Sequence, residues 1–328
     1  MTSRRPQARH AGLLIVSFIA TLAVLAGLLS VASGRERPHN SPSGLAAVPS
    51  LAVSGLTPSD AVSAPPEVAG DPVLVGAGDI ANCDSPASAE TAKLIEGIAG
   101  NVFTAGDNAY PDGTLEDFQK CYDGTWGRHK SRTRPTPGNH EYHEGHASGY
   151  FAYFGAAAGD STKGYYSYDL GTWHVVALNS NIDVSDTSAQ VAWLRADLAA
   201  HPTLCTVAYW HHAFLSSSPD ATPAMAAVWK VLYSAGVEVA VTGHHHAYER
   251  FAPVDGAAEL DKRRGIREFV VGTGGALLDN FGQTARFSER RYNDNYGVLQ
   301  LQLYPGRYAW QFVSVNGHVR DRGKSVCH

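Results

Sequence analysis

The amino-acid sequence predicts an α/β sandwich built on largely parallel strands. Short apolar runs alternate with helical patterns through most of the chain, which is typical of parallel strands joined by helices. Near the carboxyl terminus the helical patterns stop, and two alternating segments flank Pro305-Gly306 as in an antiparallel hairpin. Metal-binding residue types follow several apolar runs directly. We expect them to meet, because the carboxyl ends of strands in open α/β sheets form the ligand crevice.

The predicted elements alternate in chain order. The apolar runs that read as strands are Val73–Gly78, Val102–Gly106, His174–Leu178, Thr206–Trp210, Val237–Thr242 and Glu268–Gly272. The helical patterns between them are Ala87–Ile98, Ser188–Leu198 and Pro223–Ala235. The hairpin strands are expected at Tyr296–Leu303 and Arg307–Val315, where they would close one sheet.

Composition excludes two broad classes of protein. The 328 residues are 44% hydrophobic and 17% charged, which excludes a disordered chain. The net charge is -5 and the 26 basic residues are scattered, so charge alone gives no nucleic-acid footprint. The 15 histidines, an unusually large number, are the feature that composition leaves unexplained.

The amino terminus has the layout of an export signal. Arg4, Arg5 and Arg9 precede an uncharged apolar run over residues 11–31, and Ser30-Val31-Ala32 offers a small-residue cleavage site. We therefore predict that residues 1–32 form a signal peptide, with an uncleaved signal anchor as the alternative, because the run is long enough to cross a bilayer. The protein is then secreted or extracytoplasmic, anchored to the membrane by residues 11–31 only if they are retained.

A Ser-, Pro- and Ala-rich tether is predicted over residues 33–71, followed by a single folded domain over residues 72–328. This domain contains all four cysteines, and an even cysteine count in an exported domain predicts two disulfides. Three pairings are possible. Cys83–Cys121 with Cys205–Cys327 is favoured, because the first two cysteines lie in loops beside the two earliest polar motifs.

Four predicted strands end directly on Asp or His: Asp79, Asp107, His211 and His244. A fifth polar block, Pro137–Glu141, follows another short run. One such residue alone is better explained as a capping aspartate or a hydrogen-bonded core histidine. The occurrence of Asp or His at four or five strand ends favours a shared metal site.

The motifs then show a specific resemblance. Gly78-Asp79, GDNAY (106–110), GNHE (138–141), the run ending at His211 and GHHHAYER (243–250) occur in the order of the calcineurin-like metallophosphoesterases. More narrowly, the set resembles the purple acid phosphatases. The resemblance implies a four-layer αββα sandwich with one catalytic domain and a binuclear metal centre.

One position narrows the expected metals. Most members of the superfamily carry a histidine two residues after the first aspartate, and here Ala81 stands there. Purple acid phosphatases use instead a tyrosine three residues after the second aspartate, which matches Tyr110. Because a phenolate is a hard anionic ligand, the resemblance implies Fe(III) plus a divalent ion such as Zn, Mn or Fe(II).

The resemblance also implies a role for each matching residue. The expected ligands are Asp79, Tyr110 and His246 for the first ion, Asp107 for both ions, and Asn139, His211 and His244 for the second. His140 is expected to bind a phosphate oxygen and protonate the leaving group. The ions would activate a hydroxide that attacks phosphorus, so no serine or cysteine nucleophile is needed.

These residues predict a metal-dependent phosphatase that hydrolyses small phosphate monoesters, of the acid phosphatase type. A phosphodiesterase acting on nucleotides or phospholipid head groups would use the same centre and is the main alternative. A non-catalytic surface binding protein should lose metal ligands, and none is missing. His143, His146 and His212 lie near the expected ligands in sequence; both substrate contact and a loop role stay open for them.

Overall fold

The computed structural model describes residues 70–219 and 223–328, which belong to one compact unit, Ser59–His328. The predicted export segment, 1–32, and residues 33–69 of the predicted tether lie outside the described residues. Within the described part of the chain, no helix has both the length and the apolar character needed to cross a bilayer.

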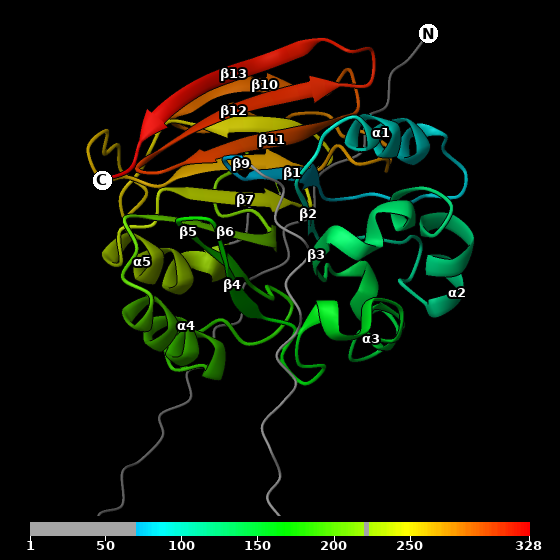
Figure 1. Cartoon of the computed structure of the whole chain (residues 1–328), viewed down its shortest axis with the longest axis horizontal. Coiled ribbons are helices and arrows are strands. Elements are labelled where there is room, and N and C mark those ends of the chain that lie inside the picture. The colour runs from blue at the N-terminus through cyan, green and yellow to red at the C-terminus, as the bar shows by residue number, and fades with distance from the viewer. Residues whose placement is uncertain (1–69, 220–222) are drawn as a thin grey trace, which may run out of the picture. The chain divides into compact units, whose positions relative to one another are not determined.

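Two mixed β-sheets form the centre of this unit (Figure 1). The six-stranded sheet has the order β13 (Val319–Val326), β12 (Arg307–Ser314), β11 (Gly297–Tyr304), β1 (Val73–Ala77), β2 (Asn101–Ala105), β3 (Thr133–Thr136). The seven-stranded sheet has the order β10 (Ser288–Tyr292), β8 (Tyr248–Phe251), β9 (Arg267–Val271), β7 (Val239–Gly243), β6 (Cys205–His212), β5 (Trp173–Ala177), β4 (Tyr166–Leu170). Strands β1–β3 run parallel to one another, as do β5, β6, β7 and β9.

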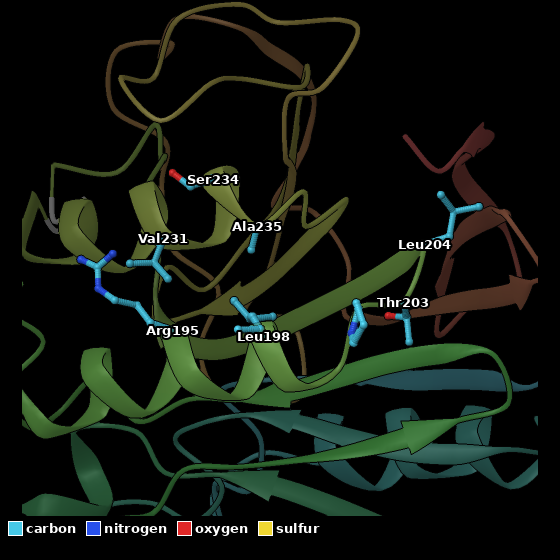
Figure 2. A pocket seen from close by; sticks show the side chains of 9 residues that line it. Arg195, Leu198, Thr203, Leu204, Val231, Ser234 and Ala235 are labelled. Carbon is cyan, nitrogen blue, oxygen red and sulfur yellow. The ribbon is translucent and has the colours of Figure 1, made fainter.

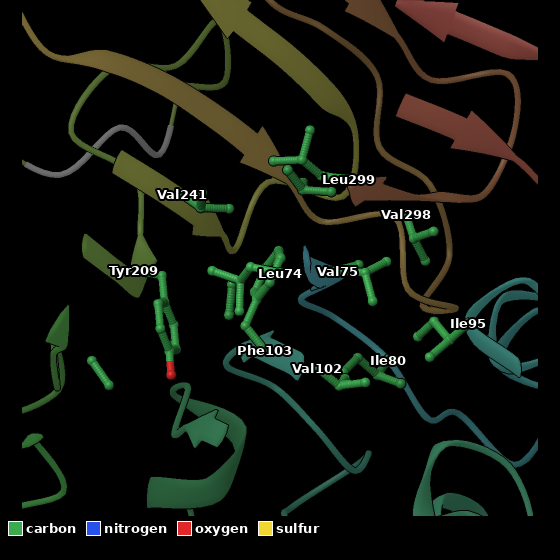
Figure 3. Packing of buried hydrophobic residues seen from close by; sticks show 14 of the residues in the cluster. Leu74, Val75, Ile80, Ile95, Val102, Phe103, Tyr209, Val241, Val298 and Leu299 are labelled. Atoms are coloured by element: carbon green, nitrogen blue, oxygen red, sulfur yellow. The ribbon is translucent and has the colours of Figure 1, made fainter. Parts of the chain in front are cut away.

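The two sheets pack face to face, as the alternating directions of the β6 side chains show. Successive side chains of a strand point to opposite faces. Val207 and Tyr209 join the core that also holds Leu74 and Phe103 of the first sheet, as Figure 3 shows for Tyr209, Leu74 and Phe103. Ala208 packs instead with residues of α4 (Ala189–Ala200) and α5 (Ala226–Ser234). Strand β6, inside the second sheet, is therefore buried on both faces.

Helices cover the outer faces of the two sheets. Figure 1 shows α4 and α5 on one side, and α1 (Ala87–Glu96), α2 (Leu115–Asp117) and α3 (Ser148–Phe154) on the other. Ile95 of α1 belongs to the same core as Val298 of β11 (Figure 3). The predicted four-layer αββα sandwich is thereby confirmed.

The predicted strands and helices are present, with ends shifted by up to three residues. At the start of α4, the Ser188 hydroxyl accepts a hydrogen bond from the Val191 N–H at 3.2 Å and so caps the helix. The hairpin prediction is correct for β11 and β12 but wrong about the edge of the sheet, because β13 pairs outside β12. The β13 sequence, VRDRGKSV, is mostly polar and half-exposed, so it carries no apolar alternation to detect.

Both favoured disulfides are confirmed: Cys83–Cys121 and Cys205–Cys327. Cys205 begins β6 of the seven-stranded sheet, and Cys327 follows β13 of the six-stranded sheet. The second bridge therefore joins the two sheets covalently.

Candidate functional site

The predicted site residues meet at the carboxyl ends of β1, β2, β6 and β7. Asp79 and Asp107 follow neighbouring parallel strands, and the Asp79 N–H donates to the Gly106 carbonyl at 3.0 Å. Both aspartates have left-handed backbone angles, with φ of 59° and 48°. Such strain in non-glycine residues concentrates at functional sites, where the surrounding structure maintains it.

The first group of predicted ligands lies around the Tyr110 hydroxyl. Tyr110 Oη is 3.2 Å from Asp79 Oδ1 and 3.1 Å from His246 Nε2. His246 Nε2 is itself 3.2 Å from Asp79 Oδ1. Burial and the carboxylates of Asp79 and Asp107 raise the pKa of Tyr110 well above its usual value. A bound cation would be needed to keep this phenol ionised.

The second group lies around Nε2 of His211, a fully buried side chain. This nitrogen is 3.0 Å from Asn139 Oδ1 and 3.2 Å from His244 Nδ1. The His244 N–H donates to Asp79 Oδ2 at 2.9 Å, which ties this group to the first.

Asp107 joins the two groups. Its Oδ2 is 3.3 Å from Tyr110 Oη and 3.3 Å from His211 Nε2. Burial opposes ionisation of Asp107, but His211 and His140 outweigh it and hold its pKa well below the usual range. One ionised carboxylate oxygen thus lies between both groups.

The donor set fits two cations. His211 Nδ1 lies 2.8 Å from the Ala105 carbonyl and His246 Nδ1 lies 2.8 Å from the Leu277 carbonyl. Because a carbonyl only accepts, each ring carries a proton on Nδ1 and turns Nε2 toward the carboxylates. Burial lowers the pKa of each ring, but Asp107 raises that of His211 to about 9, and Asp79 raises that of His246 to about 9. The carboxylates therefore stabilise a positive charge at Nε2 of both rings. Either a proton or a metal ion can supply that charge.

Two glycines allow this close packing. A Cβ atom on Gly138 would lie 2.1 Å from Asp107 Oδ1. Gly106 has a φ of +78°, and its Cβ would lie 2.5 Å from His211 Nδ1. A larger residue at either position would displace a predicted ligand.

Glu141 is the last residue of the GNHE motif, and its sequence position gives no indication of its role. Its fully buried carboxylate accepts hydrogen bonds from the N–H groups of Gly138 at 2.7 Å, Asn108 at 2.8 Å and Ala109 at 3.2 Å. Burial and the nearby Asp107 raise the pKa of Glu141 to about 7, against the lowering effect of the backbone donors. Glu141 thus links the loop after β2 to the loop after β3.

His140 and His143 lie at the edge of the centre. The His140 N–H donates to Asp107 Oδ1 at 2.9 Å, and its ring centroid is 4.3 Å from that of Tyr110. The His143 ring is 4.7 Å from the His140 ring, and its Nδ1 is 3.0 Å from Asp112 Oδ1. His146 is exposed, and its backbone φ is 62°.

His212 and His245 are next to predicted ligands in the sequence, but their rings have different neighbours. His212 Nδ1 lies 2.9 Å from Ser180 Oγ, and its ring centroid is 4.5 Å from that of His244. Burial and the neighbouring His211 and His244 lower the pKa of His212 to about 3. His245 contacts Ser216 and Phe281 rather than the predicted ligands.

A separate cavity of about 650 Å³ lies between α4 and α5 (Figure 2). Arg195 and Leu198 line it from α4, and Val231 and Ser234 line it from α5. None of the predicted site residues lines this cavity.

Comparison with known proteins identifies the family of this chain. The sequence profile of the family described as Calcineurin-like phosphoesterase matches residues 68–248, more than half of the chain. Purple acid phosphatase 23 of Arabidopsis thaliana is 32% identical over 164 residues, which cover 43% of this chain and 35% of that protein. Purple acid phosphatase 15 of the same plant is 31% identical over 204 residues, which cover 56% of this chain and 37% of that protein. The match thus spans little more than a third of these relatives.

Solved structures show the same fold. Purple acid phosphatase PPD1 from yellow lupin (Lupinus luteus) seeds matches with a TM-score of 0.65 and 19% identity, covering 78% of this chain and 54% of that chain. GAP50, the anchor in the inner membrane complex of Plasmodium, matches with a TM-score of 0.61 and 13% identity, covering 79% and 89%. At these identities the structural likeness establishes the fold alone. The family match, the relatives and the shared fold together establish that the chain belongs to the calcineurin-like phosphoesterase family and is similar to the purple acid phosphatases within it.

Proposed function

We propose that this chain is an exported phosphatase that hydrolyses phosphate monoesters at a two-metal centre, with residues 72–328 as its catalytic domain. One observation carries the proposal: Asp107 Oδ2 lies 3.3 Å from both Tyr110 Oη and His211 Nε2, so one oxygen is shared by two ligand groups. Two-metal phosphatases hold their ions about 3.5–4 Å apart, which suits a shared carboxylate. The two disulfides support an oxidising compartment.

The chemistry of the two groups suits different ions. The proposed ligands are Asp79, Tyr110 and His246 for the first ion, Asn139, His211 and His244 for the second, and Asp107 for both. Hard phenolate and carboxylate oxygens favour Fe(III), whereas imidazoles with an amide oxygen suit a divalent ion such as Zn, Mn or Fe(II). When bound, such ions polarise the phosphoryl oxygens and supply a nucleophile from water near neutral pH.

His140 is the proposed general acid. Its Nδ1 bonds to the Pro111 carbonyl, so that nitrogen carries a proton and Nε2 is the nitrogen free to act. Nε2 lies 3.8 Å from Asp107 Oδ2 and therefore faces the centre. A general acid must be doubly protonated here: with one proton held on Nδ1, the imidazolium form of His140 gives its second proton, on Nε2, to the leaving oxygen as the ester P–O bond breaks, and the leaving group departs as an alcohol.

The metal content and visible spectrum of the purified full chain test the proposed centre. We expect two metal ions per chain and a tyrosinate-to-Fe(III) charge-transfer band that disappears in Tyr110→Phe. A colourless, iron-free and active enzyme would contradict the iron assignment, while two bound ions without any hydrolysis would indicate a binding protein.

Hydrolysis of p-nitrophenyl monoester and diester substrates tests the reaction class. We expect faster turnover of the monoester; a preference for the diester would identify a phosphodiesterase instead. His140→Ala should keep both ions and lose about 100-fold or more in kcat, the usual contribution of a general acid. An unchanged kcat in His140→Ala would contradict the proposed role of His140 as general acid.

A further inference from the structure

We infer that His212 is a substrate-binding residue of this centre, which donates its Nε2–H to a phosphoryl oxygen beside the second ligand group. The inference rests on the proposed function. His212 is the last residue of β6 and directly follows His211.

The position of the ring relative to the predicted ligands is the first argument. One ring nitrogen of each of His211, His212 and His244 lies within 4.8 Å of the others. The His212 ring centroid is 4.9 Å from that of His211 and 4.5 Å from that of His244. A group bound to this half of the centre is therefore within reach of the His212 ring.

Ser180 fixes the ring orientation. Its hydroxyl oxygen accepts the His212 backbone N–H at 3.1 Å and lies 2.9 Å from His212 Nδ1. The hydroxyl hydrogen can then donate to Nδ1, which places the ring proton on Nε2. Within residues 70–219 and 223–328, no group bonds to Nε2, yet this atom is not buried. The Nε2–H donor is thus preorganised and open to a ligand.

The charge of the site supplies a reason for such a donor. Within the described part of the chain, no lysine or arginine side chain forms a hydrogen bond or ion pair with the seven predicted ligands. A phosphate dianion would need hydrogen-bond donors in addition to the ions. His140 lies beside Tyr110 of the first group, and His212 lies beside His244 of the second. The two histidines can thus bind different oxygens of one phosphoryl group.

Calorimetric titration of the metal-loaded full chain with inorganic phosphate tests this inference, alongside the metal content of each variant. We expect His212→Ala to keep two ions per chain and to raise the phosphate Kd about tenfold or more, as for a lost hydrogen bond to a charged group. Ser180→Ala should raise Kd less, because the ring remains but its orientation is released. His212→Gln, which can still donate, should recover part of the affinity. His318→Ala removes an exposed histidine from the β12–β13 turn and is the matched control, with no expected change.

Three results would overturn the inference. If the wild type is active and His212→Ala binds phosphate as tightly as the wild type, His212 does not bind substrate, while the proposed function stands. Loss of one ion in His212→Ala would make His212 a metal ligand instead. A wild-type chain that binds no metal ions would remove the proposed function and this inference together.

Discussion

Replacing Glu141 with alanine tests how strongly one buried carboxylate holds the candidate centre together. The side chain is fully buried and accepts three backbone N–H groups, those of Gly138, Asn108 and Ala109, at 2.7–3.2 Å. These donors belong to the loops that carry Asp107 and the GNHE motif. Glu141→Ala would leave all three donors buried without a partner.

The expected loss follows from those three contacts. Each unsatisfied buried donor costs about 1–3 kcal/mol, and breaking a buried charged network costs about 3–5 kcal/mol, so we expect about 3–5 kcal/mol. For a domain of this size each 1 kcal/mol lowers Tm by about 2–4 °C, which gives a decrease of about 6–20 °C. Glu141→Gln keeps the shape but turns an NH₂ group toward at least one backbone donor. We expect it to cost at least about 2 kcal/mol.

Thermal and urea denaturation of the metal-free chain measure this loss directly, and metal content measures its effect on the centre. Glu116→Gln is the control, because that carboxylate is 69% exposed and forms an ion pair with Lys120. We expect Glu116→Gln to leave the unfolding midpoints nearly unchanged, because solvent screens an exposed ion pair. If Glu141→Ala unfolds like the wild type and binds the same metals, the argument from buried backbone donors is wrong.

Three further outcomes are expected. Burial opposes protonation of His174, but the carboxylates of Asp197 and Asp169 outweigh burial and raise its pKa. The protonated ring therefore stabilises the folded state fully below pH 6.5, the ordinary pKa of histidine. This stabilisation is lost as the pH rises through the raised pKa. In urea denaturation, His174→Gln should therefore destabilise the protein more at pH 5.5 than at pH 9, and equal losses at the two pH values would contradict this. Replacing both Cys205 and Cys327 with serine opens a loop with a sequence separation of 122 residues and should cost about 5 kcal/mol in chain entropy, measured as a lower urea midpoint; an unchanged midpoint would contradict it. Removing metals with a chelator should lower Tm and abolish hydrolysis, and re-added metal should restore both; an unchanged Tm would show that the ligands bind no stabilising ion.

The elements detected from the sequence are those whose apolar pattern is strong. β1, β2, β6 and β7 are buried runs that end on Asp or His, so both their positions and their polar ends could be read directly. β10 and β13 could not, because their sequences, SERRY and VRDRGKSV, are mostly polar and belong to half-exposed strands at the edges of their sheets. Edge strands bury little apolar area, so the hydrophobic pattern that identifies interior strands is weak in them.

The sequence by itself determined the alternation of strands and helices, the polar residues at the strand ends and the family resemblance, because these depend on local order along the chain. Only the tertiary structure decided which atoms share the centre. The Leu277 carbonyl orients His246, Ser180 orients His212, and Glu141 joins two loops. The partners Leu277–His246, Ser180–His212 and Asn108–Glu141 are 31, 32 and 33 residues apart in the chain. No periodicity encodes such contacts, since they arise only when parallel strands bring the ends of separate segments to one edge.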